Sequence, residues 1–209
     1  MVKPAELKSY WDIVTPKWKG KIVVFDHNYT GYGHEQLKFL YYNPELGPEF
    51  FKKVYSEMDV AISADPRQMT DWLAQGKYAF ALGASPSFLE ANAAKAQGLP
   101  VDWFGPKQFK EGVALTSGAS CTGLINKSPH PNAAKVAINW ILSREGQLAY
   151  QKILDPGHDS LRTDIPKDIV PPDLRRVDGL KYLSPDRPEW LDLKPIRDFI
   201  NKVLAERKN

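Results

Sequence analysis

Short apolar runs alternate with amphipathic segments along the first half of the chain. Residues 21–25, 60–62 and 77–82 are runs of β-branched and other apolar residues, which predicts buried strands. Between the first two runs, apolar residues recur at three- and four-residue spacing after Gly33 and again after Pro48, which predicts two helices. This alternation is typical of an α/β sheet, parallel or mixed, with helices on both faces.

Capping residues mark the ends of two further helices. Asp65 suits an N-cap, and the side chain of Gln68, three residues later, can complete a capping box. Gly76 suits the position just after that helix, because glycine adopts the left-handed backbone conformation without strain. An Ala-rich helix is expected from Ser87 to Gly98.

The remainder of the chain changes from strands to helices. Strand candidates follow at 101–104, 112–115 and 121–125, and the pattern then becomes helical. We therefore expect an α/β lobe over residues 1–126, with a three-layer α/β/α architecture and a mixed sheet, and a mainly helical part over residues 127–209. Six residues are expected in or near the core of the lobe: Trp11, Val23, Phe25, Leu37, Trp72 and Phe80.

Composition and charge narrow the function classes. The 209 residues carry a formal net charge of +3, and basic residues are interspersed with acids, which disfavours nucleic-acid binding. No apolar run is long enough for a transmembrane helix. The sequence contains a single cysteine, Cys121, so neither an intrachain disulfide nor a cysteine-based metal site is expected. We expect no metal and no cofactor.

Sequence motifs of the common enzyme classes are missing. The chain has no G-x-S-x-G elbow, no phosphate-binding P-loop and no G-x-G-x-x-G fingerprint, and its four histidines lack zinc-protease spacing. His27 beside Asp26 could act as a base, but no nucleophile accompanies it. We therefore expect a protein without catalytic activity.

Two loops that follow predicted strands carry the candidate ligand contacts. In open α/β sheets, ligands lie beyond the carboxyl ends of the strands. The loop 26–33 supplies glycines, a hydroxyl and aromatic rings, and N–H groups at the start of the next helix favour an anion. The loop 83–88 adds two serines. The candidate ligand-binding residues are Asn28, Tyr29, Thr30, Gly31, Tyr32, Ser85 and Ser87.

Plainer interpretations of these residues remain open. Thr30 and Ser87 can simply cap the helices that follow them, with the glycines serving the turns. Arg162 can bind a ligand carboxylate or phosphonate through two hydrogen bonds. It can instead tie down its own loop through Asp159 or Asp164, and we favour this second interpretation.

Three segments together resemble a known family. In the segment Pro129–Gln147, Ser143 is suited to cap a second helix that directly follows the first. Trp11–Ile22, Trp72–Tyr78 and Pro129–Gln147 resemble periplasmic solute-binding proteins of ABC importers, in the branch that includes the ferric-iron binders. The resemblance implies a protein that holds a small anionic or polar solute between two lobes in the periplasm and delivers it to a membrane permease. It also favours solute contact by the loop 26–33.

The resemblance carries expectations about the extent of the chain. In the family, a preceding segment builds much of the first lobe. Residues 1–126 then correspond to the second lobe and residues 127–209 to the helical C-terminal part of the first, with the last helix able to return to the second. The chain would be the C-terminal part of such a protein. Its first residues lack the apolar segment of a signal peptide, so an export signal would lie outside this sequence.

One departure from the ferric-iron binders concerns the ligand. Those proteins carry adjacent tyrosines shortly after the strand that follows the Trp-Leu-x-x-Gly helix, and phenolate oxygens suit a hard cation. Here residues 83–89 read Gly-Ala-Ser-Pro-Ser-Phe-Leu. The adjacent pair Tyr41–Tyr42 lies on an earlier helix, where packing is the favoured role. We therefore expect a small organic solute rather than iron.

Two further questions stay open at this level. The apolar stripes of the last helices need cover, which either a homodimer or packing back onto the lobe can supply. These stripes are Val136, Ala137, Trp140 and Ile141, and then Ile196, Phe199, Ile200 and Val203. The alternative to transport is a stand-alone ligand-sensing or interaction domain, and an α/β enzyme is the third choice.

Overall fold

The chain forms two compact units. Our computed structural model describes residues 2–29, 33–83, 87–114, 122–153, 159–170, 172 and 175–207, without the side chains of 87–90. Unit 1 comprises Met1–Ser117 with Leu180–Asn209, and unit 2 comprises Gly118–Gly179. The chain therefore returns to unit 1 for its last helix. The assignment of residues 1–126 and 127–209 to two lobes stays a prediction.

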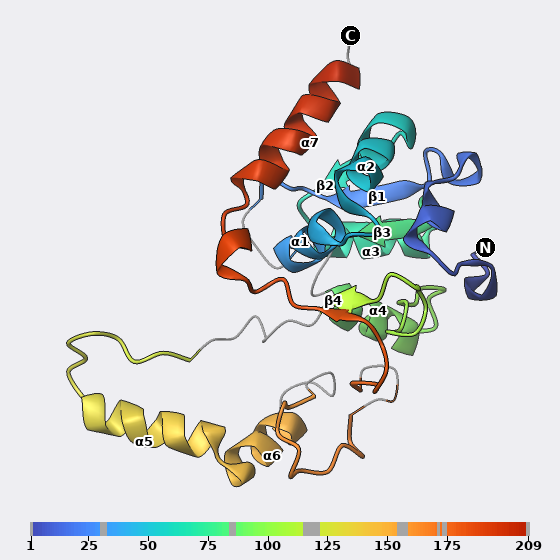
Figure 1. Cartoon of the computed structure of the whole chain (residues 1–209). Helices are drawn as coiled ribbons and strands as arrows, with labels where there is room; N and C mark the ends of the chain where they lie inside the picture. The colour runs from blue at the N-terminus through green and yellow to red at the C-terminus, as the bar shows by residue number, and fades with distance from the viewer. Residues whose placement is uncertain are drawn as a thin grey trace. The chain divides into compact units, whose positions relative to one another are not determined.

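A parallel three-stranded sheet lies at the centre of unit 1 (Figure 1). Its strands are β1 (Ile22–Phe25), β2 (Ala61–Ser63) and β3 (Phe80–Leu82), in the order β2-β1-β3. Val23 of β1 is in register with Ala61 on one side and Ala81 on the other. The three strands predicted from the apolar runs are confirmed. The expected mixed sheet is wrong for the described residues, because every strand pair there is parallel.

A second sheet of two short parallel strands also belongs to unit 1. It pairs β4 (Val113–Ala114) with β5 (Tyr182–Leu183). The strand candidate 101–104 is wrong, because Asp102 accepts a hydrogen bond from the N–H of Trp103 and these residues pair with no strand. Residues 122–125, the described part of another candidate, form no strand either.

Helices of unit 1 begin and end close to the predicted positions. They are α1 (His34–Tyr42), α2 (Gly47–Lys52), which continues into a π-helical turn (Lys53–Glu57), α3 (Pro66–Ala74), α4 (Ser87–Ala96) and α7 (Lys194–Arg207). Short 3-10 helices span Pro4–Glu6, Tyr10–Val14, Pro16–Trp18 and Pro188–Trp190.

The capping residues of α3 largely act as predicted. The carboxylate of Asp65 accepts hydrogen bonds from the N–H groups of Arg67 and Gln68, and Gly76 has a φ of +70°. The expected capping box is not formed. The side-chain oxygen of Gln68 instead accepts a hydrogen bond of 2.8 Å from the hydroxyl of Ser63, which ties the end of β2 to α3.

The residues of β1 alternate between two apolar layers. Ile22 and Val24 belong to the larger cluster, with α1 and α2. Val23 and Phe25 pack with Met69 of α3 in a smaller cluster. Since successive side chains of a strand point to opposite faces, this split shows that helices cover both faces of the sheet.

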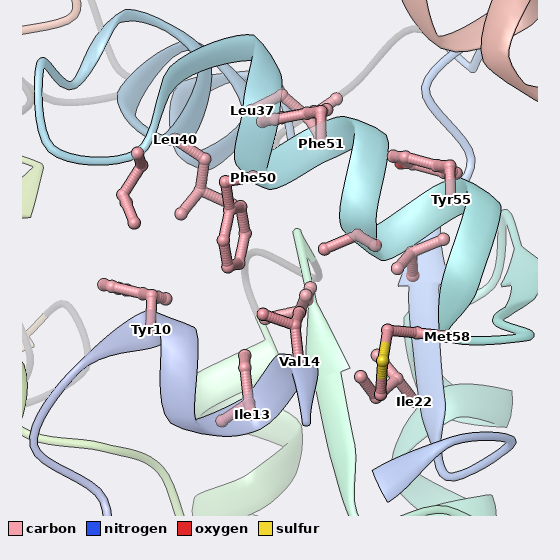
Figure 2. Packing of buried hydrophobic residues seen from close by; sticks show 14 of the residues in the cluster. Tyr10, Ile13, Val14, Ile22, Leu37, Leu40, Phe50, Phe51, Tyr55 and Met58 are labelled. Atoms are coloured by element: carbon pink, nitrogen blue, oxygen red, sulfur yellow. The ribbon is translucent and has the colours of Figure 1, made fainter. Parts of the chain in front are cut away.

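The predicted core residues divide between the two clusters. Figure 2 shows Tyr10, Ile13 and Val14 of the N-terminal 3-10 helix pointing toward Phe50 and Leu40. The expected core residues Val23, Phe25, Leu37 and Phe80 are buried, and Trp11 and Trp72 are partly buried against the two clusters. Burial raises the pKa of Tyr10 to about 12.

Helix α7 packs on unit 1 through its apolar stripe. Ile196, Ile200 and Val203 are buried in the larger cluster, beside α1, α2 and the π-helical turn. The chain itself therefore covers this stripe, and the homodimer that the sequence suggested is not needed there. Within unit 2, Val136 and Trp140 remain exposed.

Unit 2 is built around the junction between α5 (Pro131–Leu142) and α6 (Arg144–Ile153). The hydroxyl of Ser143 accepts a hydrogen bond from the N–H of Gly146, which confirms Ser143 as the cap. A Cβ atom on Gly146 would lie 1.9 Å from the carbonyl oxygen of Trp140, so the junction requires glycine. Ser143 and Gly146 thus both serve the junction between the two helices.

Arg162 ties down its own loop in unit 2, as favoured from the sequence. Its guanidinium donates two hydrogen bonds of 2.7 Å to the carboxylate of Asp164 and a third to the carbonyl of Leu142, at the end of α5. Hydrogen bonding from Arg162 lowers the pKa of the Asp164 carboxyl group. Each of the three guanidinium nitrogens thus donates a hydrogen bond within the protein.

Candidate functional site

The carboxyl ends of β1, β2 and β3 lie at one edge of the sheet, because the three strands are parallel (Figure 1). Three segments leave the sheet there: Asp26–Tyr29 after β1, Ser63–Asp65 after β2, and Gly83 after β3. In open α/β sheets, this is the edge at which ligands bind. The first and third segments belong to the two loops predicted to contact a ligand.

These two loops touch each other through glycines. A Cβ atom on Gly33 would lie 2.3 Å from the carbonyl oxygen of Gly83 and 2.6 Å from Cδ1 of Phe25. The N–H of Gly83 also donates a hydrogen bond to the side chain of Gln36 on α1. The start of α1 and the end of β3 are therefore in direct contact.

Two of the predicted site residues are described in full. Asn28 is exposed, and the ring of Tyr29 is 54% exposed with its edge against Phe25, 5.9 Å between ring centroids. Ser87 is the first residue of α4, and its side chain lies outside the described part of the chain. Four further candidates, and the cysteine, lie outside the described residues altogether: Thr30, Gly31, Tyr32, Ser85 and Cys121.

The loop after β1 is held by its own hydrogen bonds. The N–H of Asn28 donates to a carboxylate oxygen of Asp26 at 2.9 Å, and the N–H of Tyr29 donates to the carbonyl of Asp26 at 3.1 Å. The N–H of Asp26 in turn donates to the carbonyl of Ser63. The N–H groups of Asn28 and Tyr29 are therefore already used and do not serve an anion.

The N-terminus of α1 offers other N–H groups. Gly33 stands at the N-cap position, and no described side chain caps this helix. The first N–H groups of a helix have no partner within the helix and carry partial positive charge. Thr30, for which a capping role was open, lies outside the described residues. This helix start favours a negatively charged or hydrogen-bond-accepting group beside Gly83.

Residues of α7 contact the same loop, and sequence reasoning missed them. The ring of His27 is 2% exposed, and its Nε2 lies 2.9 Å from Oδ1 of Asn201. Arg197 donates a hydrogen bond of 3.0 Å to the carbonyl of His27. About 170 residues separate the partners, and no local pattern could have connected them. His27, considered above as a base, is thus a buried structural residue.

His34 connects the first turn of α1 to the loop. Its Nε2 donates a hydrogen bond of 2.7 Å to the carbonyl of Tyr29 and lies 3.4 Å from the guanidinium of Arg197. Partial burial lowers the pKa of His34, the Tyr29 carbonyl opposes this effect, and the positive charges of Arg197 and Lys38 add to it. The neutral ring is therefore the form that the folded protein favours.

Tyr41 and Tyr42 have packing roles, as expected. The ring of Tyr41 packs edge-on against Tyr42, Phe51 and Phe199, and the ring of Tyr42 stacks on Trp190 with centroids 4.6 Å apart. Burial raises the pKa of both phenols. Within the described part of the chain, no cluster of three histidine, cysteine or acidic side chains could hold a metal.

Comparison with known families gives one match. The family model for bacterial extracellular solute-binding proteins matches residues 8–148, well over half of the chain. The match spans the central sheet, both candidate loops and the helix junction in unit 2, whereas α7 follows it. No curated protein matches the chain. Among the described helices, none is long and apolar enough to cross a membrane.

Replacing Gly33 with alanine tests the contact between the two loops. The backbone of Gly33 is already helical, so the cost comes only from the added methyl group against the Gly83 carbonyl and Phe25. We expect Gly33→Ala to lower the free energy of unfolding by about 1–3 kcal/mol in urea titrations. Gly123→Ala is the control, because a Cβ atom there meets nothing within 4 Å. Equal stability of the two variants would contradict the contact.

The stability of the protein should depend on His34 as the pH falls. The pKa of His34 is lowered in the folded state, so the unfolded chain binds the proton first. The contribution of His34 is therefore present above the unfolded pKa of about 6.5 and decreases as the pH falls below it. Urea titrations from about pH 8 to 5 should show wild type losing more stability than His34→Gln. Parallel pH profiles of the two proteins would show that the shift is absent.

Proposed function

The chain belongs to the bacterial extracellular solute-binding protein family, and we propose that it captures a small anionic or polar organic solute for an ABC importer. Its partners would be the solute and a membrane permease, and its location the periplasm or the cell exterior. Members of such a family bind their ligands without transforming them. His27, the one candidate base, fits this role, because its ring is buried and faces Asn201.

The observation that carries the proposal is the contact between Gly33 and Gly83 at the carboxyl edge of the sheet. Two loops that are about fifty residues apart in sequence meet where α/β folds bind ligands. The absence of Cβ atoms on both residues lets the backbones of the two loops meet directly. The site proposed here comprises Asn28–Tyr32, Ser85 and Ser87.

The groups at this edge suit a polar or anionic organic molecule. The start of α1, which no side chain of the described residues caps, can donate N–H groups to a carboxylate or phosphonate oxygen. Tyr29 is half-exposed and its ring offers an apolar wall, and the exposed side chain of Asn28, held by His27 and Asn201, adds polar surface beside it. Asp26 is the acid of the loop, and one of its oxygens already accepts the N–H of Asn28. A bare cation would need more acids.

A thermal-shift screen identifies the solute class. The screen comprises small organic acids, phosphonates, polyamines and ferric salts. A ligand present at 100 times its Kd adds about 2.7 kcal/mol to the free energy of unfolding, which is readily measured. We expect stabilisation by organic acids or phosphonates. Stabilisation by ferric salts alone would contradict the proposed ligand class.

Calorimetry on site variants then tests the location. Tyr29→Ala removes the aromatic wall, and Thr30→Ala with Ser85→Ala removes a hydroxyl from each loop. We expect each variant to bind the solute found in the screen about tenfold more weakly, the equivalent of about 1.4 kcal/mol. Asn132→Ala, on the exposed surface of α5, is the control and should bind like wild type. Wild-type affinity in both site variants would refute the location.

A further inference from the structure

Helix α7 holds the proposed binding loop from outside. Three buried side chains fix the helix on unit 1: Ile196, Ile200 and Val203. Arg197 and Asn201 lie four residues apart and hence on one face of the helix. This face is next to the loop after β1, and both residues form hydrogen bonds with it.

These contacts reach two consecutive residues of the loop, His27 and Asn28. Arg197 donates to the carbonyl of His27 at 3.0 Å, and Asn201 Oδ1 lies 2.9 Å from the His27 ring. The side-chain nitrogen of Asn201 donates to the side-chain oxygen of Asn28 at 3.3 Å. The guanidinium of Arg197 also lies 3.4 Å from Nε2 of His34, which donates a hydrogen bond to the carbonyl of Tyr29.

The geometry determines which form of His27 makes these contacts. Oδ1 of Asn201 can only accept, so Nε2 of His27 carries the proton when the two atoms form a hydrogen bond. Nδ1 of His27 is buried without a hydrogen-bond partner among the described residues, 3.9 Å from a carboxylate oxygen of Asp26. The side-chain nitrogen of Asn28 also lies 3.1 Å from Nε2 of His27, so Asn201 and Asn28 together surround this ring nitrogen.

We propose that Arg197 and Asn201 are positioning residues that fix the loop presenting Asn28 and Tyr29 to the solute. The inference rests on the proposed function for its effect on binding, but the effect on the loop is independent of any ligand. The matched family segment ends at residue 148, so these two residues lie beyond it. Because α7 is packed in the larger cluster, its hydrogen bonds hold the loop in this conformation without a bound solute.

The first test measures the loop itself, by amide hydrogen exchange in NMR spectra of the full chain. In Asn201→Leu, exchange at Asn28 and Tyr29 should rise about tenfold or more, as expected for the loss of one or two hydrogen bonds. Exchange in β1 should stay near wild type, and the Nε2–H resonance of His27 should shift. Lys202→Ala, on the exposed side of α7, should leave all three readouts unchanged.

A conservative variant separates positioning from simple loss of folding. Asn201→Asp keeps an oxygen acceptor for His27, replaces the donor to Asn28 by a second acceptor and adds a negative charge, so the His27 resonance should return toward wild type while the contact with Asn28 Oδ1 is lost. Unchanged exchange at Asn28 and Tyr29 in Asn201→Leu and in Arg197→Met would overturn the inference. So would an equal rise throughout unit 1, since it would indicate general destabilisation.

The second test measures binding, by calorimetry with the organic acid or phosphonate that stabilises wild type most. Asn201→Leu should weaken binding about tenfold without touching the solute, while Asn201→Asp should recover part of it. Faster exchange with unchanged affinity would overturn the link to binding and leave the proposed function intact. If wild type binds no compound, the proposed function fails, and the exchange data alone still decide whether α7 positions the loop.

Discussion

The burial of β1 between two layers of helices is the constraint on which unit 1 depends. No residue from Ile22 to Phe25 is more than 2% exposed, and the strand pairs on both sides. Such a strand must be apolar at every position and must have partners on both edges and both faces. The helices between the strands cover the two faces of the sheet. Because the strands are parallel, the loops that follow β1 and β3 lie at the same edge.

This arrangement explains how a chain without catalytic motifs can still have a defined ligand site. The buried strand fixes where the loop after β1 begins, the carboxylate and carbonyl of Asp26 shape the turn, and α7 fixes the loop from outside. Glycines at positions 33 and 83 then bring the start of α1 against the end of β3. Backbone groups and a few polar side chains thus do most of the recognition that we propose.

Features that depend on local chemistry were predictable from the sequence. The three strands of the central sheet, the Asp65 cap and the Ser143 cap each follow from a few neighbouring residues. The strand β5 was not predicted, because its partner lies about seventy residues earlier and its own run is two residues long. The run 101–104, which Asp102 interrupts, pairs with no strand among the described residues.

The site was predictable only in part, for the same reason. Strand ends and glycines indicated both loops, but the contacts from Arg197 and Asn201 depend on where α7 packs. The most direct measurement is a crystal structure of the protein with the organic acid or phosphonate that stabilises it most. The account predicts electron density for the solute between Tyr29, the first turn of α1 and Gly83. Density bound elsewhere, with this edge of the sheet empty, would contradict it.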